Sequence, residues 1–350
     1  MIKKIIKAVN VVFGNFVRVQ SRLSFDEARK CLQETNPKPK GTCYTKNKLA
    51  IQYDLHIIIP AYNAEKYIKE CLESVFIQVS EYSVLATVVN DGSTDQTSII
   101  LENLKKLYKG SQIDIEIINQ DNKGYSGARN TALSFIRGKY IIFLDADDVL
   151  PQDTIEVMLD TAYEYDADIL QGSWYTFTNE KKKEHRVKES GKESGSQGYI
   201  SGYPWGKLYK YSVLENFQFP DGYWFEDTPI SFILAALPFK CISIDNIVYG
   251  YRLNSEGITS KAVYSEKSID SYWITEQCLK EFPKFKVHYD QKAYEYLLQQ
   301  SIMNAWRIRK QKRKVRESEF VLITKLMDDY FKGFHTKNAN MRKVENALRK

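Results

Sequence analysis

The chain has 350 residues, of which 43% are apolar and 27% are charged, and a formal net charge of +6. This length suggests about two domains of ~150 residues, and the composition supports packed cores and excludes wholesale disorder. No apolar run approaches the ~18 residues of a membrane-spanning helix, no signal peptide is readable, and the five scattered cysteines, without a CxxC pair, predict reduced cytosolic thiols rather than zinc or disulfides.

The N-terminal region, residues 1–50, is predicted to be an amphipathic segment followed by a linker. Apolar side chains recur at helical spacing over residues 2–17, with Lys3, Lys4 and Lys7 on other faces. A cationic amphipathic helix can lie in the headgroup region of a bilayer. The alternative is that the stripe packs on the protein itself or on a second subunit in a homodimer. Residues 18–50 look like a connector, because residues 36–41 form a cluster of breakers.

Strands and helices then alternate from about residue 54 to residue 170. This order predicts an α/β fold with a mostly parallel central sheet and flanking helices, in which ligands bind beyond the carboxyl ends of the strands. The expected strands are 55–59, 84–89, 113–118 and 140–144, with a fifth opening at 168–170, and the expected helices are 64–78, 94–108, 127–137 and 153–165.

The later part of the chain is less regular. Residues 181–198 read as a solvated loop, residues 199–255 as aromatic and irregular, and residues 265–350 as helices. We therefore expect a catalytic domain over 51–255 and a C-terminal helical region over 256–350. Basic ends around an acidic centre indicate an anionic partner surface, for which we favour a membrane over nucleic acid. The C-terminal basic residues are Arg307, Arg309, Lys310, Lys312, Arg313, Lys314 and Arg316.

The first expected strand ends in Pro60-Ala61-Tyr62-Asn63, without glycine. The Gly-rich turn of dinucleotide-binding Rossmann folds is therefore absent where it should stand, and no P-loop is present. This argues against a nicotinamide or flavin enzyme of the Rossmann type.

Polar residues follow the second and third strands. Asp91 stands at a strand tip, where a carboxylate can accept a hydrogen bond from a uracil-type base or a ribose hydroxyl. The alternative is a simple turn and helix cap. After the third strand come Lys123 and Gly124, and Arg129 in the next helix is suited to a phosphate or the base, unless it is a surface arginine.

The fourth strand ends in Asp145-Ala146-Asp147-Asp148. Neighbouring carboxylates repel one another unless a cation neutralises them, and oxygen ligands suit Mg²⁺ or Mn²⁺ bridging a diphosphate. A helix cap would need only one carboxylate. The acidic and basic groups at one sheet edge predict a site for a nucleoside diphosphate.

These motifs, in this order, resemble the inverting family 2 glycosyltransferases of the GT-A fold, of the bacterial polysaccharide type. The resemblance covers about residues 54–255. It is carried by Ile58 to Asn63, Cys71-Leu72-Glu73-Ser74, Val89 to Asp95, Asn122-Lys123-Gly124 with Ala128-Arg129-Asn130, and Leu144 to Asp148.

The resemblance implies a nucleotide-sugar donor, usually UDP-linked, and a metal-dependent reaction. Asp91 would bind the base, Asp145 and Asp147 would be the DxD pair with Asp147 on Mn²⁺ or Mg²⁺, and Glu226-Asp227 would supply the general base. No histidine matches the metal ligand that some relatives use. Further donor-side candidates are Pro60, Tyr62, Asn63, Lys123, Gly124, Arg129 and Ala146, and the acceptor-side candidates are Trp205, Lys207 and Trp224.

Some alternatives remain at this point. The aromatic residues before Glu226 favour a desolvated, basic carboxylate, but Asp227 also suits a helix cap. Trp205 and Trp224 are acceptor-side candidates, although tryptophans more often pack in a core. The resemblance implies transfer to a glycan or lipid-linked glycan in cell-surface polysaccharide or glycolipid assembly, by a cytoplasmic protein peripheral to the inner face of the plasma membrane. The competing functions are a sugar-phosphate nucleotidyltransferase and a non-catalytic binding protein.

Overall fold

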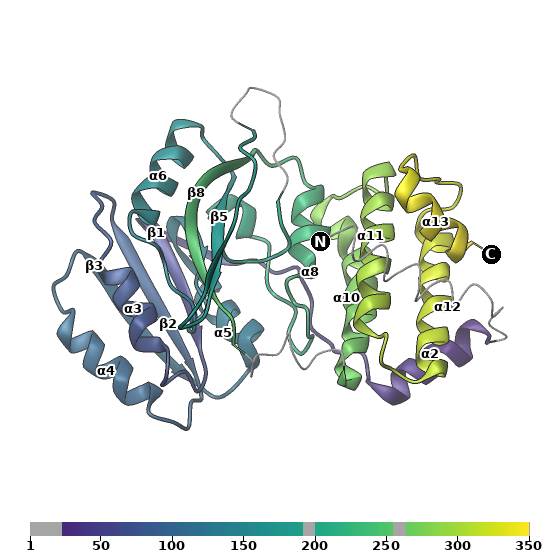
Figure 1. Cartoon of the computed structure of the whole chain (residues 1–350), viewed down its shortest axis with the longest axis horizontal. Coiled ribbons are helices and arrows are strands. Elements are labelled where there is room, and N and C mark those ends of the chain that lie inside the picture. Colours follow the sequence, from purple (N-terminus) through teal and green to yellow (C-terminus); the bar gives the residue numbers. More distant parts are fainter. Residues whose placement is uncertain (1–22, 192–199, 255–263, 350) are drawn as a thin grey trace. The chain divides into compact units, whose positions relative to one another are not determined.

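The computed structural model describes residues 23–191, 200–254 and 264–349 (Figure 1). The amphipathic stripe expected over residues 2–17 lies outside them. Contacts divide the chain into two units. The sheet unit comprises Thr42–Asp221 and Leu237–Asn254, and the helical unit comprises Met1–Gly41, Gly222–Ala236 and Ser255–Lys350.

One mixed sheet forms the centre of the sheet unit, with the order β3-β2-β1-β4-β7-β5-β6 and β8 paired to β5. The strands β3, β2, β1 and β4 are mutually parallel, which confirms the predicted core, whereas β7 runs antiparallel to both β4 and β5. The strands are β1 Lys48–Ala61, β2 Val84–Asp91, β3 Ile113–Gln120, β4 Phe135–Phe143, β5 Ile169–Phe177, β6 Lys182–His185, β7 Lys207–Lys210 and β8 Cys241–Arg252.

Helices cover this sheet and bury its apolar side chains. Alternate residues of β1 point to one face, so Leu55, Ile57 and Ile59 share a core with Ile68 of α3 and Leu101 of α4. Burial of such side chains contributes roughly 1.5–3 kcal/mol each. The helices are α3 Ile68–Phe76, α4 Thr97–Leu107, α5 Gly124–Leu133, α6 Thr154–Glu164 and the short α7 Tyr211–Leu214.

Two boundaries differ from the prediction. The helix expected over 127–137 ends at Leu133, and Phe135 already pairs with Lys48 in the sheet. Gly138 permits this pairing, because a Cβ there would stand 2.4 Å from the His56 backbone nitrogen. The expected loop at 181–198 contains β6, a hairpin partner of β5. β6 is largely exposed, so it lacks the apolar signature of a buried strand. The start of β4 alternates between exposed and buried residues, and Phe135 and Ile136 also suit the helix that was expected there.

The helical unit contains the described C-terminal helices, which the sequence predicted over 265–350, and one helix that the sequence had not revealed. Within the expected connector, α2 spans Phe25–Thr35 and is capped reciprocally by Ser24 and Glu27. None of the helices in the described ranges has the length and apolar character needed to cross a bilayer. The other elements are α8 Thr228–Phe232, η1 Leu234–Ala236, η3 Glu266–Ile269, α10 Asp270–Glu281, η4 Phe282–Phe285, α11 Gln291–Arg307, α12 Arg313–Tyr330 and α13 Ala339–Leu348.

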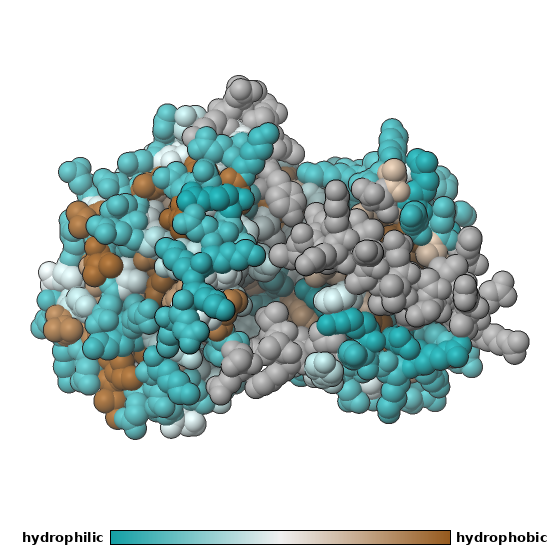
Figure 2. Space-filling model, viewed as in Figure 1, coloured by the Kyte–Doolittle hydropathy of each residue, from teal (hydrophilic) through white to brown (hydrophobic). Residues whose placement is uncertain are grey.

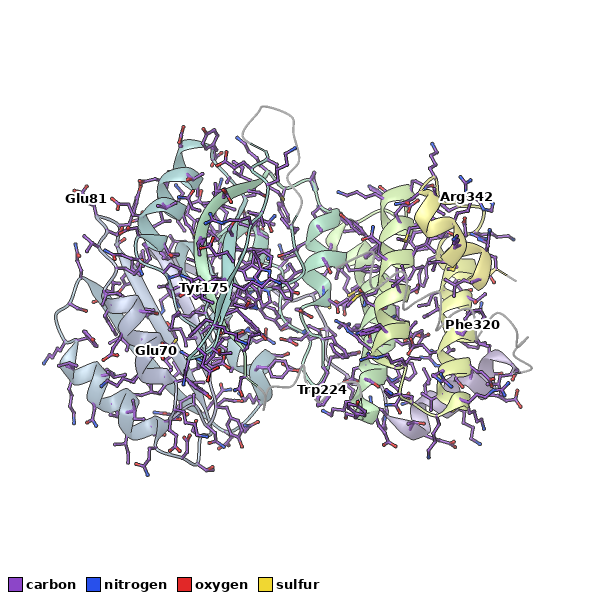
Figure 3. The ribbon with its side chains drawn as sticks, viewed as in Figure 1. Glu70, Glu81, Tyr175, Trp224, Phe320 and Arg342 are labelled. Carbon is purple, nitrogen blue, oxygen red and sulfur yellow. The ribbon has the colours of Figure 1, made fainter. Side chains whose placement is uncertain are left out.

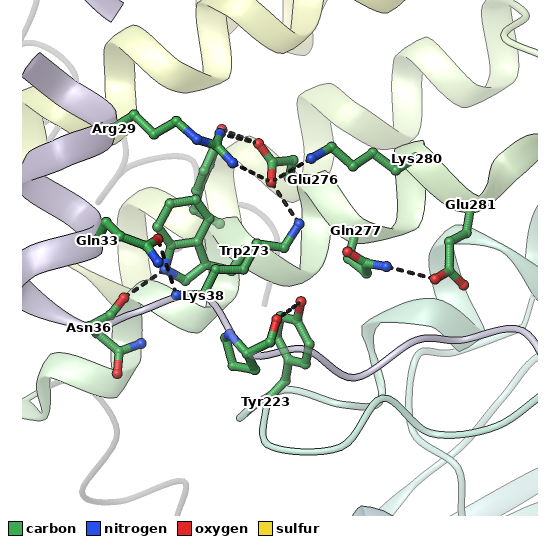
Figure 4. Close-up of polar contacts among 12 residues, drawn as sticks. Arg29, Gln33, Asn36, Lys38, Tyr223, Trp273, Glu276, Gln277, Lys280 and Glu281 are labelled. Carbon is green, nitrogen blue, oxygen red and sulfur yellow. Dashed lines mark hydrogen bonds and ion pairs between the residues drawn. The ribbon is translucent and has the colours of Figure 1, made fainter. Parts of the chain in front are cut away.

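A buried carboxylate ties α2 to α10 (Figure 4). Glu276 is 3% exposed; its Oε1 lies 2.6 Å from Arg29 Nη1, and its Oε2 lies 2.7 Å from Lys38 Nζ and 3.4 Å from Lys280 Nζ. Burial alone would raise the pKa of Glu276, but the hydrogen bond from Arg29 and the charge of Lys38 outweigh it and lower the pKa to about 2. The ionised form is therefore favoured by folding.

Replacing Glu276 by Gln is expected to destabilise the chain by roughly 3 kcal/mol at neutral pH, since each pKa unit corresponds to about 1.4 kcal/mol. Because the folded pKa is depressed, this stability is present above pH 4.5 and is lost as the pH falls towards 2. Chemical denaturation of both proteins across pH 2–7 measures it. The control is Glu317→Gln, whose partner Arg313 is largely exposed, so that pair contributes ~0–1 kcal/mol. Equal losses in the two variants would contradict the role of Glu276.

Candidate active site

The loops after the parallel strands come together because β2 and β4 both pair with β1 in parallel register. The loop after β1 exchanges hydrogen bonds with the loop after β2. Asn63, at φ +48°, donates its backbone N–H to Ser93 Oγ (3.0 Å) and accepts from the Thr94 N–H at its Oδ1 (2.8 Å), while the Ala64 N–H donates to Thr97 Oγ1 (2.8 Å). These contacts form a reciprocal clasp, which orders Asn63. In the same loop, Pro60 is half-buried and Tyr62 is 53% exposed.

Asp91 is the last residue of β2 and is buried. Its Oδ1 accepts hydrogen bonds from Gln120 Nε2 (2.7 Å) and from the backbone N–H of Lys123 (2.8 Å). No described residue donates to its Oδ2. Lys123 thus contacts Asp91 through its backbone, and Gly124, at φ +73°, begins α5 directly after it. The arrangement fixes one carboxylate oxygen and leaves the other for a ligand's N–H or O–H group.

Arg129 of α5 pairs with Asp145 rather than with solvent. Its Nη2 lies 2.7 Å from Asp145 Oδ1, and its side chain is 5% exposed. The guanidinium also lies over the rings of Tyr125 and Phe219, at 5.8 and 5.1 Å. The predicted phosphate contact of Arg129 would therefore be shared with its partner carboxylate.

The three aspartates after β4 have different surroundings. Asp148 is 1% exposed and accepts hydrogen bonds from Tyr249 Oη and the Arg252 backbone N–H, both 2.7 Å. Burial, and then the charges of Asp145 and Asp147, hold its pKa well above the usual range. Asp148 is thus bound to β8, a role that the motif alone did not reveal.

Arg252 supports the same loop from the end of β8. Its Nε donates to the carbonyl oxygen of Asp147 (2.7 Å), and its Nη2 pairs with Glu70 of α3 (2.7 Å). Figure 3 labels Glu70 on the ribbon of the sheet unit. The Tyr249 hydroxyl also accepts from the Asp145 N–H (3.2 Å). In the sequence, the run Tyr249-Gly250-Tyr251-Arg252 indicates only weakly that Arg252 lies near the diphosphate, and it gives no sign that Tyr249 holds Asp148.

The carboxylates at this site fit a divalent cation only if a bound diphosphate supplies further oxygen ligands. Burial and the charge of Asp145 raise the pKa of Asp147, a repulsion that a cation would relieve. Yet within the described ranges no three His, Cys, Asp or Glu side chains surround a common point. Asp147 and Asp145 would supply one or two oxygen ligands, and diphosphate oxygens would complete the shell, as is usual for Mg²⁺. Ala146 between them is buried.

The acceptor-side candidates Trp205 and Lys207 lie inside the sheet unit. Trp205 is 8% exposed and stacks on Tyr249 and on Tyr203, with ring centroids 4.7 and 4.6 Å apart. Lys207 is 1% exposed and donates from Nζ to Ser201 Oγ (2.7 Å). Tyr203, which the prediction omitted, is the exposed member of this stack at 40%.

Glu226 and Asp227 belong to the helical unit, whereas the donor candidates belong to the sheet unit. Glu226 is 9% exposed, and Asp227 is half-buried and precedes α8 without a side-chain cap hydrogen bond. Trp224 is half-buried in the same segment (Figure 3). On the face shown in Figure 2, apolar side chains are scattered over the sheet unit, and the visible described surface of the helical unit is mostly hydrophilic.

Two solved structures are similar to this chain in fold. S. aureus TarS 1-349, in complex with UDP-GlcNAc, is 20% identical with a TM-score of 0.51, covering 85% of this chain and 91% of that one. The mannosyltransferase PcManGT of Pyrobaculum calidifontis, in complex with GDP-Man and Mn²⁺, is 14% identical with a TM-score of 0.51, covering 99% of this chain and 92% of that one. The predicted GT-A fold is confirmed.

Curated relatives match part of this chain in sequence. Glycosyltransferase GlyA of Streptococcus pneumoniae is 32% identical over 60% of this chain, but the match spans only 32% of GlyA. GlyG of the same organism is 26% identical over 58% of this chain and 72% of GlyG. Chondroitin synthase of Pasteurella multocida is 42% identical over 29% of this chain and 10% of that protein.

The pattern of the family described as Glycosyl transferase family 2 matches residues 56–225. This range begins in β1 and takes in Asp91, Arg129 and the run from Asp145 to Asp148. Residues 56–225 therefore have the sequence of a glycosyltransferase family 2 domain, and the fold of the chain is GT-A.

Proposed function

We propose that the protein transfers a sugar from a nucleoside-diphosphate donor, foremost a UDP-sugar, to a hydroxyl group of a glycan or lipid-linked glycan acceptor. One observation carries the proposal: Asp91, held through Oδ1 alone, stands at the same sheet edge as Asp145 and Asp147. The neighbours crystallised with UDP-GlcNAc and GDP-Man support a nucleotide-sugar donor. Relatives that include a chondroitin synthase support a role in cell-surface polysaccharide or glycolipid assembly.

In this proposal Asp91 accepts a hydrogen bond from the base, and Asn63 and Tyr62 border the nucleotide. A bound Mn²⁺ or Mg²⁺, held by Asp147 with Asp145, would neutralise charge on the departing diphosphate. Arg129 keeps Asp145 oriented through their ion pair. Asp227, with Glu226 beside it, removes the proton of the acceptor hydroxyl, which attacks the anomeric carbon. A single displacement on an α-linked donor yields a β-linked product.

The acceptor would contact aromatic side chains. Tyr203 presents an exposed ring backed by Trp205, while Lys207 holds the loop beneath through Ser201. Trp224 offers a second, half-buried ring. Aromatic faces of this kind suit sugar rings.

A donor screen tests the proposed function. The full chain is incubated with UDP-, GDP- and other nucleotide sugars, with Mn²⁺ or with chelator, and release of the nucleoside diphosphate is measured. We expect one donor class to be consumed in a metal-dependent manner. Absence of turnover with every donor, or release of pyrophosphate from nucleoside triphosphate and sugar phosphate instead, would contradict the proposal.

We also propose peripheral docking on an anionic membrane surface. The turn after α11 exposes Lys310 and Lys312, and the first turn of α12 exposes Arg313 and Lys314. By contrast, Arg307 and Arg309 of the same basic run lie over aromatic rings, at 3.7 and 3.6 Å. Each basic residue near an anionic leaflet contributes about 1 kcal/mol. Docking would bring the donor site to a lipid-linked acceptor on the cytoplasmic face.

Vesicle sedimentation measures this docking. Binding to anionic vesicles is expected to weaken at high salt and to drop when Lys310, Lys312 and Lys314 are changed to Gln. Removal of residues 1–20 is expected to reduce it further. The matched control changes Lys105, Lys106 and Lys109, three exposed lysines of the sheet unit, to Gln. If the full chain stays in the supernatant at low salt, or if both triple variants behave alike, the docking surface is wrong.

A further inference from the structure

The segment before the proposed base has a strained backbone. Phe225, directly before Glu226, has φ +66°. A bulky residue rarely adopts this left-handed conformation, which persists only where the surroundings hold it, and such positions concentrate at functional sites. The contacts that hold Phe225 and its neighbours therefore decide where Glu226 and Asp227 stand.

Two contacts come from the long helices of the same unit. Arg307, the last residue of α11, places its guanidinium 3.7 Å from the centre of the Phe225 ring and donates from Nη1 to Ser271 Oγ (2.9 Å). Asp270, the fully buried first residue of α10, accepts the backbone N–H of Trp224 at Oδ2 (2.9 Å) and the Asn36 amide at Oδ1 (2.6 Å). The ring of Phe225 and the backbone of Trp224 are thus both held in place.

We propose that Arg307 and Asp270 are positioning residues for the general base: they hold the turn at Phe225 and so orient the carboxylates of Glu226 and Asp227. This inference rests on the proposed function. It assigns a catalytic purpose to the helical unit, whose residues 255–350 lie beyond the range matched by the family.

The neighbouring Arg309 serves as a comparison, because it stacks on a residue only three positions earlier in the chain. It lies 3.6 Å from the ring of Trp306 and donates to the carbonyl oxygen of the same residue (2.6 Å). Arg307 instead reaches a segment about 80 residues earlier in the chain. Its charge also lowers the pKa of Glu319, a buried carboxylate of α12 whose pKa burial raises to about 8. A test must therefore separate the ring contact from the charge.

Kinetics of the full chain with its donor and acceptor provide that test. Arg307→Met is expected to lower kcat about 10- to 100-fold with the donor KM unchanged, since small misplacements of a catalytic group cost this much. Arg309→Met removes an equivalent stack and is expected to retain wild-type kcat. Arg307→Lys keeps the charge beside Glu319 but not the planar group, so it should restore kcat only in part. Complete rescue by lysine, or equal losses at 307 and 309, would overturn the proposal.

A double variant distinguishes positioning from general damage. If Arg307 acts through the base, Asp227→Asn with Arg307→Met should be no slower than Asp227→Asn alone, within about twofold. Multiplied losses would overturn the proposal. Thermal midpoints report folding; if Arg307→Met fails to fold, Asp270→Asn, which keeps volume and one acceptor, undergoes the same kcat and KM comparison. Absence of wild-type transfer with any donor would instead refute the proposed function.

Discussion

Asp147→Ala is expected to abolish turnover and to weaken metal-dependent nucleotide binding. Asp147 is the half-buried carboxylate after β4 whose pKa is raised by burial and by the charge of Asp145, a repulsion that a cation would relieve. Because the pKa is raised, protons compete with the cation, and metal affinity should fall on acidification at a higher pH than for an ordinary aspartate. Activity assays and nucleotide titration with Mn²⁺, Mg²⁺ and chelator measure both effects.

The neighbouring aspartate is the control for this result. Asp148 is bound to Tyr249 and to the Arg252 backbone, so Asp148→Asn is expected to lower the thermal midpoint while leaving residual activity dependent on metal. Asp147→Ala should leave the midpoint near that of the wild type. Full activity of the wild type in chelator would refute the cation requirement.

Asp227→Asn is expected to lower the rate of transfer by about 10² or more while donor binding persists, because base catalysis typically contributes 10²–10⁴. The amide keeps the shape of the side chain but cannot take the acceptor's proton. Single-turnover transfer and donor titration separate the two effects. Glu226→Gln is the matched variant: if it abolishes transfer and Asp227→Asn does not, the base is one residue earlier.

The parallel core could be predicted chiefly from its buried central strands. Every residue of β2 is inaccessible, so its sequence reads as an apolar run bounded by turn residues. The exposed first half of β1 and the charged β6 carry no such signal, since cross-strand hydrogen bonds rather than apolar burial place them. The helix α2 was hidden by the breakers that follow it, although its Ser24 and Glu27 cap was readable.

The candidate site was predictable where it consists of local motifs. Asp91, Asp145 and Asp147 each end or follow a strand, and strand ends are visible in sequence. Tyr249 and Arg252 reach the same loop from about 100 residues away, through pairing of β5 with β8 that no local pattern encodes. For the same reason, the contact of Arg307 with Phe225 is visible only in three dimensions.

The clasp between the loops after β1 and β2 has an evolutionary consequence. Asn63 both donates to Ser93 and accepts from Thr94, and Thr97 receives the N–H of Ala64. A change in either loop therefore removes a partner from the other, and loss of the Thr97 hydroxyl leaves the buried N–H of Ala64 without its hydrogen bond. Substitutions in the two loops are therefore expected to accompany one another in descendants of this sequence.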